Sequence, residues 1–116
     1  MTASGSEPSA GPASFEAVPG DVEGAWILHV GGEIDVATAP ELRRELHQLA
    51  DRGATSIVVD LAHVSFVDSS GLGVLVGMLK RVRDDGRGCQ LVLEHLQEPV
   101  RKVFDITGLT EIFAIQ

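Results

Sequence analysis

The residues best suited to chemistry in this chain are Asp68, Ser69 and Ser70, which interrupt an otherwise strongly apolar stretch. Asp68 suits the N-cap of a helix, because a carboxylate there accepts hydrogen bonds from unpaired amides of the first turn. The two serines then fall in that turn, where free amide donors and the positive end of the helix dipole favour negative charge. Gly71 has no side chain to block approach to this backbone. The segment therefore predicts a helix start that tolerates a phosphoserine, which carries roughly −1.5 to −2 charges.

The same residues also suit an ordinary helix cap, with Gly71 permitting close packing of the helix on a sheet. Other acids can join the segment, since functional residues of an open parallel sheet gather beyond the carboxyl ends of its strands. Asp35 follows one predicted strand and Asp60 lies near the end of another, so both can approach Ser69. Each of these acids equally suits a turn or a cap. The residues alone leave the structural and the functional interpretations open.

Signatures of enzymes and of ligand sites are weak. A nucleophile elbow has glycine two residues before its serine, whereas Val67 precedes Ser69 by two. A dinucleotide-binding loop has a third glycine where this chain has Val76. The residues alone therefore indicate no catalytic residue, no metal and no cofactor. The histidines are dispersed without a metal-ligand spacing, at His29, His47, His63 and His95.

Composition narrows the classes of partner and location. The 116 residues suit a single domain with one core. Seventeen acids against nine bases give a net charge of −8, which argues against nucleic acid because nucleic-acid binders need a basic face. The longest apolar run, residues 71–79, is shorter than the roughly 20 residues of a membrane span, so we expect no membrane insertion. With one cysteine, Cys89, and no signal peptide, we expect a cytoplasmic protein.

The elements that position the serines begin after residues 1–14, whose Ala, Ser, Gly and Pro content predicts a flexible tail. Strands over residues 14–18 and 24–30 are joined by a turn-rich segment and predict an antiparallel hairpin. Thr38 and Glu41 have the spacing of a capping box at the start of a helix. We expect this helix to stop near Gly53. Its predicted buried stripe is Leu42, Leu46 and Leu49.

The remaining elements alternate between strand and helix. Residues 55–61 read as a buried parallel strand, and a helix follows from about Ser69 to Arg83. A buried strand over residues 86–94, a short helix ending at Gly108 and a strand over residues 111–115 complete the chain. Alternation after the opening hairpin implies parallel strands with right-handed crossovers. The predicted fold class is α/β, a single domain with a mixed, mostly parallel sheet packed against helices.

Three segments of the chain, GGEIDVATAPELRREL, IVVDLAHVSFVDSSGLGVLVGMLKRVRDDG and VRKVFDITGL, occur in the order found in bacterial STAS-domain anti-sigma factor antagonists. The chain resembles this family over residues 15–116, which implies a STAS domain that is not an enzyme but a partner-switching regulator of transcription. In the family, the unphosphorylated protein binds an anti-sigma factor that is also a serine kinase, and this binding frees the sigma factor. The kinase phosphorylates the serine directly after the motif's aspartate and ends the binding, and a PP2C-type phosphatase removes the phosphate.

The resemblance assigns the phosphorylated residue to Ser69, with Ser70 as the second choice. Asp35, Asp68 and Gly71 match positions that flank the acceptor or bind the partner. The family usually continues into a further helix, which is absent from this chain, so we expect an apolar face around Phe113 and Ile115 to be exposed. The alternative function is a non-switching STAS adaptor subunit of a lipid-transport or stress-sensing complex, and a nucleotide-binding protein or enzyme is a third class.

Overall fold

The computed structural model describes residues 13–116. The predicted tail, residues 1–14, lies outside this range except for its last two residues, and the second of these, Ser14, already begins the first strand. In chain order the elements are β2 (Ser14–Pro19), β3 (Ala25–Ile34), α1 (Ala39–Asp51), β4 (Ser56–Val67), α2 (Ser69–Asp84), β5 (Gln90–Glu94), α3 (Glu98–Thr107), the 3₁₀ helix η1 (Leu109–Glu111) and β6 (Ala114–Ile115).

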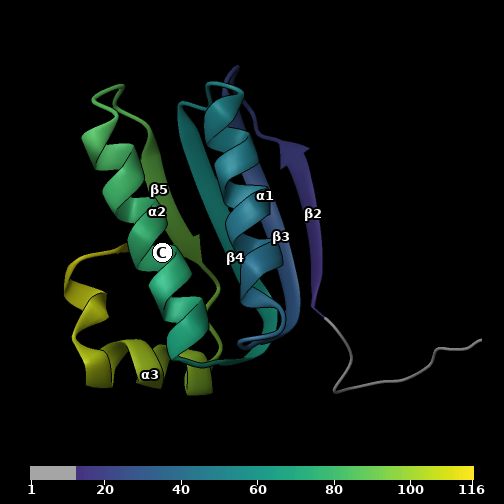
Figure 1. The fold of residues 1–116 in the computed structure, drawn as a ribbon, viewed down its shortest axis with the longest axis vertical. Helices are drawn as coiled ribbons and strands as arrows, with labels where there is room; N and C mark the ends of the chain where they lie inside the picture. Colours follow the sequence, from purple (N-terminus) through teal and green to yellow (C-terminus); the bar gives the residue numbers. More distant parts are fainter. Residues whose placement is uncertain (1–12) are drawn as a thin grey trace, which may run out of the picture.

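The strands form one sheet in the order β2-β3-β4-β5-β6. β2 pairs antiparallel with β3, and each later strand pairs parallel with the strand before it. Helices α1 and α2 lie side by side on one face of the sheet, whereas α3 lies at the end of the sheet where α2 begins (Figure 1). The α/β class, the opening hairpin and the parallel crossovers are therefore confirmed. None of the helices within residues 13–116 is long and apolar enough to cross a membrane.

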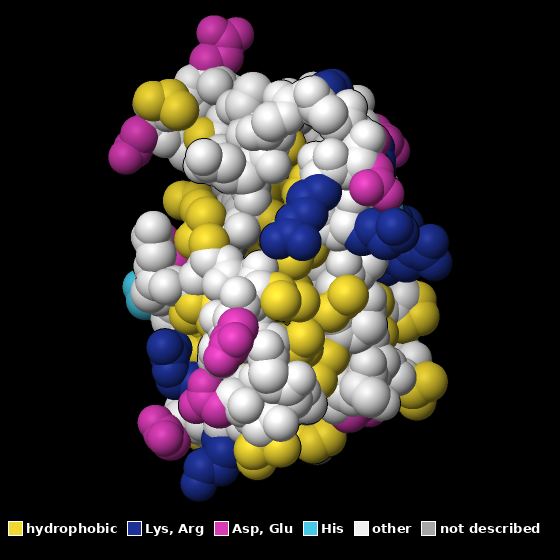
Figure 2. All heavy atoms as spheres, turned by 90° about the vertical axis from the view of Figure 1, so that its left-hand side faces the viewer, with side chains coloured by type: hydrophobic (Ala, Val, Ile, Leu, Met, Phe, Trp, Pro, Cys, Tyr) yellow, Lys and Arg dark blue, Asp and Glu magenta, His cyan; other side chains and the backbone are white. Residues whose placement is uncertain are grey.

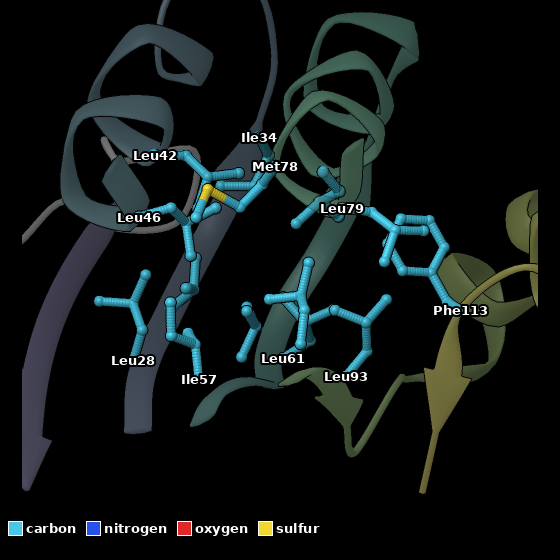
Figure 3. Close-up of a cluster of buried hydrophobic side chains, with 14 of the residues drawn as sticks. Leu28, Ile34, Leu42, Leu46, Ile57, Leu61, Met78, Leu79, Leu93 and Phe113 are labelled. Carbon is cyan, nitrogen blue, oxygen red and sulfur yellow. The ribbon is translucent and has the colours of Figure 1, made fainter. Parts of the chain in front are cut away.

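The core fills the space between the sheet and the two helices, and the labelled side chains of Figure 3 point into it from both sides. The predicted stripe of α1 is confirmed, since Leu42, Leu46 and Leu49 are each at most 2% exposed. Full burial of a leucine stabilises a fold by about 1.5–3 kcal/mol, so this stripe fixes α1 firmly on the sheet. The opposing buried side chains include Leu28, Ile57, Val59, Met78 and Leu93.

Strand β4 is longer than its sequence predicts. The predicted strand ends at residue 61, but the observed one continues to Val67, with Val64 and Val67 buried and Phe66 exposed. Irregularities in the register between β3 and β4 allow both strands to continue to a common end. The longer strand matters for the site, because it brings Val67 opposite Ile34 and delivers Asp68 to the edge of the sheet.

Two predicted helix ends agree with the structure. α1 ends at Asp51, and Gly53 follows with φ +86°, a left-handed conformation that glycine adopts without strain. α3 ends at Thr107, and its C-cap Gly108 has φ +78°. The predicted capping box is wrong, because Thr38 precedes α1 without a side-chain hydrogen bond to the helix.

The expected exposure of Phe113 is also wrong. Its ring is 6% exposed and packs edge-on against Phe104, with centroids 5.8 Å apart, while Ile115 is partly buried against the core. The predicted strand over residues 111–115 shortens to β6, since the residues before it form η1. Exposed hydrophobic side chains on the face formed by α2 and the C-terminal segment, which Figure 2 shows between basic and acidic groups, include Val76 and Ile112.

Candidate functional site at the ends of β3 and β4

Two strand-to-helix junctions lie next to each other at one edge of the sheet. Ile34 at the end of β3 pairs with Val67 at the end of β4, and the amide of Asp68 donates to the Ile34 carbonyl at 3.1 Å. The residue after each strand is an aspartate, Asp35 or Asp68. The structure therefore brings these two predicted site residues to the same edge, as expected of the carboxyl ends of parallel strands.

Asp68 is the N-cap of α2, as predicted. Its backbone is extended, with φ −104° and ψ −171°, and its Oδ1 accepts hydrogen bonds from the amides of Ser70 at 2.8 Å and Gly71 at 3.3 Å. These two donors would otherwise be unpaired at the helix start. The carboxylate thus stabilises the first turn of α2 and fixes the direction in which its serines point.

The two serines of this turn differ in exposure. Ser69 is exposed and Ser70 is half-buried. Within residues 13–116, neither hydroxyl makes a hydrogen bond, although the Ser70 amide is held by Asp68. Ser69 therefore presents a free hydroxyl to solvent at the positive end of a helix of 16 residues.

Gly71 is buried and positions this turn by packing. A Cβ at this residue would lie 2.7 Å from Cγ2 of Ile34 and 3.0 Å from Cγ1 of Val67. Atoms cannot approach so closely, so only glycine lets α2 start directly against the ends of β3 and β4. Close helix–sheet packing, one of the two sequence interpretations of this glycine, is the one that the structure supports.

At the neighbouring junction, Asp35 and Thr38 bind each other. Asp35 Oδ1 accepts from the amides of Ala37 at 3.0 Å and Thr38 at 3.1 Å. The Thr38 hydroxyl accepts from the Asp35 amide at 2.9 Å and donates to the Glu33 carbonyl at 2.9 Å. This use of the hydroxyl explains the failed capping box. Asp35 holds a tight loop beside α2, and its junction leaves no comparable free hydroxyl.

Asp60 does not belong to this edge, contrary to the sequence expectation. Because β4 continues to Val67, Asp60 lies within the strand, where its carboxylate contacts Nδ1 of His29 at 2.7 Å and Nδ1 of His95 at 3.0 Å. Burial opposes ionisation of Asp60, but the hydrogen bonds from His95, the Ala62 amide and His29 outweigh it and lower its pKa. The hydrogen bond and the charge of Asp60 raise the pKa of His95.

This His29–Asp60–His95 cluster was missed by the sequence, in which the histidines appear dispersed. The alternation of side chains along each strand shows which residues share a face of the sheet. It does not show which residues lie opposite one another, because that depends on the register between β3, β4 and β5. His29 and Asp60 are direct partners across β3 and β4, and His95 directly follows the β5 residue paired with Asp60. In the part of the chain that the structure describes, no three or more His, Cys, Asp or Glu residues could together hold a metal ion.

Exposed hydrophobic side chains flank the edge that carries Asp35 and Asp68, and sequence reasoning missed them as well. Val36, directly after Asp35, is 74% exposed, and Phe66, directly before Val67, is 46% exposed. Such side chains beside a polar site are typical of surfaces that bind another protein. The sequence does indicate them, because Val36 and Phe66 stand close to Asp35 and Asp68, where an exposed position is usually occupied by a polar residue.

Residues 18–116 match the STAS domain family. The anti-sigma-B factor antagonist of Bacillus subtilis strain 168 is 47% identical over 88 residues, covering 76% of this chain and 78% of that protein. The protein of the same name from Staphylococcus epidermidis is 40% identical over 88 residues, covering 76% of this chain and 80% of that protein. A crystal structure of an anti-sigma factor antagonist from Mycobacterium paratuberculosis aligns with a TM-score of 0.75 and 26% identity, covering 88% of this chain and 85% of that one.

Proposed function

Because the chain belongs to the STAS domain family, we propose that it is an anti-sigma factor antagonist that is switched off by phosphorylation of Ser69. The unphosphorylated protein binds an anti-sigma factor that is also a serine kinase, and the sigma factor is released. The kinase transfers phosphate from ATP to the Ser69 hydroxyl, and a PP2C-type phosphatase hydrolyses the phosphoserine. On this proposal the protein is a cytoplasmic regulator of bacteria, a substrate of enzymes and not an enzyme itself. The relatives named anti-sigma-B factor antagonists support this assignment.

The observation that carries the proposal is the free Ser69 hydroxyl at the capped start of α2. A kinase needs a hydroxyl that it can reach, and the hydroxyl of Ser69 is exposed whereas Ser70 is half-buried. The turn does not depend on the Ser69 side chain, because Asp68 already caps it. Phosphorylation can therefore proceed without unfolding α2, and the helix dipole favours the added charge.

The same phosphate would prevent the partner from binding. A partner that packs on Val36 and Phe66 removes water from the edge between them, and a desolvated phosphate is costly unless cations pair with it. Asp35 and Asp68 already bring negative charge to this edge, so the phosphate adds repulsion towards any acidic group of the partner. The switch then works through charge at a fixed surface, without a change of fold.

Phosphosite mapping by mass spectrometry tests the proposal on protein recovered from its native cells across growth and stress conditions. The decisive peptide spans Val64 to Lys80. We expect phosphate on Ser69, with an occupancy that changes with conditions. Purified Ser69→Asp should fold but bind the kinase weakly, Ser69→Ala should bind it permanently, and Ser70→Ala should still be phosphorylated. Absence of phosphate in every condition would favour the alternative, a non-switching adaptor subunit of a lipid-transport or stress-sensing complex.

A further inference from the structure

A groove between α1 and α2 begins beside the acceptor turn and runs along the outer side of the helix layer. The two helices lie side by side (Figure 1), and the space between them is open to solvent, with a volume of about 410 Å³. Its lining comes from both helices: Arg43 and His47 of α1, and Ser70, Gly73, Val74 and Gly77 of α2. Since Ser70 lines one end, the groove is continuous with the edge that carries Ser69.

The glycines of the groove are not needed by the fold. A Cβ at Gly73 or at Gly77 would meet no atom within 4 Å, in contrast to a Cβ at Gly71, which would collide with Ile34. Glycine costs about 1 kcal/mol relative to alanine inside a helix, so α2 is less stable than it would be with larger residues here. Gly73 and Gly77 are four residues apart and lie on one face, where their lack of side chains allows another element to approach the backbone closely.

The α1 wall of the groove carries a cation, Arg43, and a histidine, His47, although the whole protein has a net charge of −8. Arg43 and His47 are four residues apart on α1 and face the same side. Among residues 13–116, the Arg43 side chain has no ion-pair or hydrogen-bond partner. Arg81, one turn beyond Gly77, is held by Asp51 at 2.7 Å and contacts His47 Nδ1 at 2.7 Å.

The contact with Arg81 decides which nitrogen of His47 can face a ligand. A guanidinium only donates hydrogen bonds, so Nδ1 of His47 accepts and Nε2 carries the proton. Burial, together with the charges of Arg81 and Arg43, lowers the pKa of His47 and keeps its ring neutral. The groove therefore offers an N–H donor from His47 and a free guanidinium from Arg43, and both favour carboxylates.

We propose that this groove docks an acidic α-helix of the anti-sigma factor, with carboxylates one turn apart bound to Arg43 and His47 and small or apolar side chains packed over Gly73 and Gly77. This inference rests on the proposed function and extends its interface from Ser69 along α2. The open, elongated shape, the bare helix backbone and the local positive charge together fit a helix bearing carboxylates. The contact is independent of the phosphate, so it supplies affinity that the phosphate at Ser69 then counteracts.

Affinity measurements on paired variants test this docking. The binding partner is the serine kinase from the source cells that phosphorylates this protein, and binding is measured by titration calorimetry without ATP. Arg43→Glu should weaken binding on the order of tenfold or more, since it replaces attraction by repulsion. The control Arg44→Glu makes the same charge change on α1 outside the groove and should bind within about twofold of the wild type.

Gly77→Leu fills the groove without touching the fold. Its melting temperature should equal or exceed that of the wild type, because leucine favours helix and a Cβ at this position meets no atom within 4 Å, while its affinity should fall on the order of tenfold. Replacing an acidic residue of the kinase by lysine should restore binding to Arg43→Glu, and this rescue identifies the contacting helix.

The outcomes separate the two proposals. If the wild type and Ser69→Asp bind the kinase equally, the phosphorylation switch fails, whatever the groove does. If Ser69→Asp loses binding but Arg43→Glu and Gly77→Leu bind like the wild type, the switch stands and the docking groove is wrong. If millimolar inorganic phosphate shifts the His47 signals in NMR spectra of the wild type but not of Arg43→Glu, and the kinase affinity of both is the same, the groove is a small-anion site instead.

Discussion

The junctions β3–α1 and β4–α2 combine the same groups, an aspartate and a hydroxyl three residues apart or fewer, and use them differently. In the first junction the Thr38 hydroxyl is bonded to the Asp35 amide and to the Glu33 carbonyl, so the loop binds itself. In the second, the Asp68 side chain caps the helix, and the hydroxyl of Ser69 makes no hydrogen bond to any of residues 13–116. The hydroxyl at the β3–α1 junction therefore stabilises its loop, whereas the hydroxyl at the β4–α2 junction stays free to react.

This difference shows what a modification site in a fixed scaffold requires. A side chain that is to be phosphorylated must not be one of those that hold the structure, or its modification would unfold the protein. Here Asp68 caps the helix and Gly71 allows the close packing, and both lie within two residues of Ser69. Substitutions at these residues should therefore affect stability, whereas substitutions at Ser69 should affect only regulation.

The largest expected effect is that of Gly71→Val, which breaks the packing of the acceptor junction. The new side chain would collide with Ile34 and Val67, and overpacking of this kind costs about 1–3 kcal/mol. Urea denaturation followed by circular dichroism measures the loss. Gly73→Val is the matched control, because a Cβ at that position meets no atom within 4 Å. Equal losses for both variants would show that helix propensity, and not the contact with the strands, explains the glycine.

Asp68→Ala should have the next largest effect. It leaves the amides of Ser70 and Gly71 without their acceptor, and loss of an N-cap costs about 0.5–2 kcal/mol. Asp68→Asn should retain most of the stability, because asparagine caps helices about as well as aspartate. A loss as large for asparagine as for alanine would mean that the charge of Asp68 stabilises α2, rather than its hydrogen bonds. Denaturation midpoints of the two variants distinguish these possibilities.

Thr38→Val and Ser69→Ala compare the two hydroxyls directly. Thr38→Val keeps the shape of the side chain but removes two hydrogen bonds at the first junction, and we expect a loss of about 1 kcal/mol. Ser69→Ala removes a hydroxyl without a partner and should stay within about 0.5 kcal/mol of the wild type. In a kinase assay the order reverses: Thr38→Val is phosphorylated normally, and Ser69→Ala is not phosphorylated at all. A clear loss of stability in Ser69→Ala would contradict the proposed division of tasks.

Part of the fold and of the candidate site can be predicted from neighbouring residues, and the rest depends on how distant elements pair and pack. The stripe of α1 and the Asp68 cap are encoded within a few neighbouring residues, so periodicity and capping rules predict them. The Thr38 capping box failed because a competing donor, the amide of Asp35, already binds the hydroxyl oxygen that would accept from the helix. The groove beside Gly77 depends on how two helices pack, which no single segment encodes. Asp60 was misplaced for a similar reason, since its partner histidines are 31 and 35 residues away.

Asp60 extends the comparison, because its partner His95 titrates whereas the amide donors of Asp35 and Asp68 do not. The pKa of His95 is raised in the folded state, so its contribution to stability is present below about pH 6.5 and disappears as the pH rises through the raised value. The pKa of Asp60 is lowered, so its contribution is present above about pH 3.9 and disappears as the pH falls through the lowered value.

The smallest predicted effect is therefore the contribution of His95, a modest fall in melting temperature from about pH 6 to pH 8 that His95→Gln should remove, while His47, whose pKa is lowered, contributes a rise over the same range in both proteins. His63→Gln is the control, because His63 is exposed and pairs with no carboxylate within residues 13–116. Calorimetric melting curves at several pH values measure the slope for each variant. An unchanged slope in His95→Gln would place the titrating contact elsewhere. A changed slope would show that pH acts on the sheet through the contact of His95 with Asp60, away from the edge where we propose that phosphorylation acts.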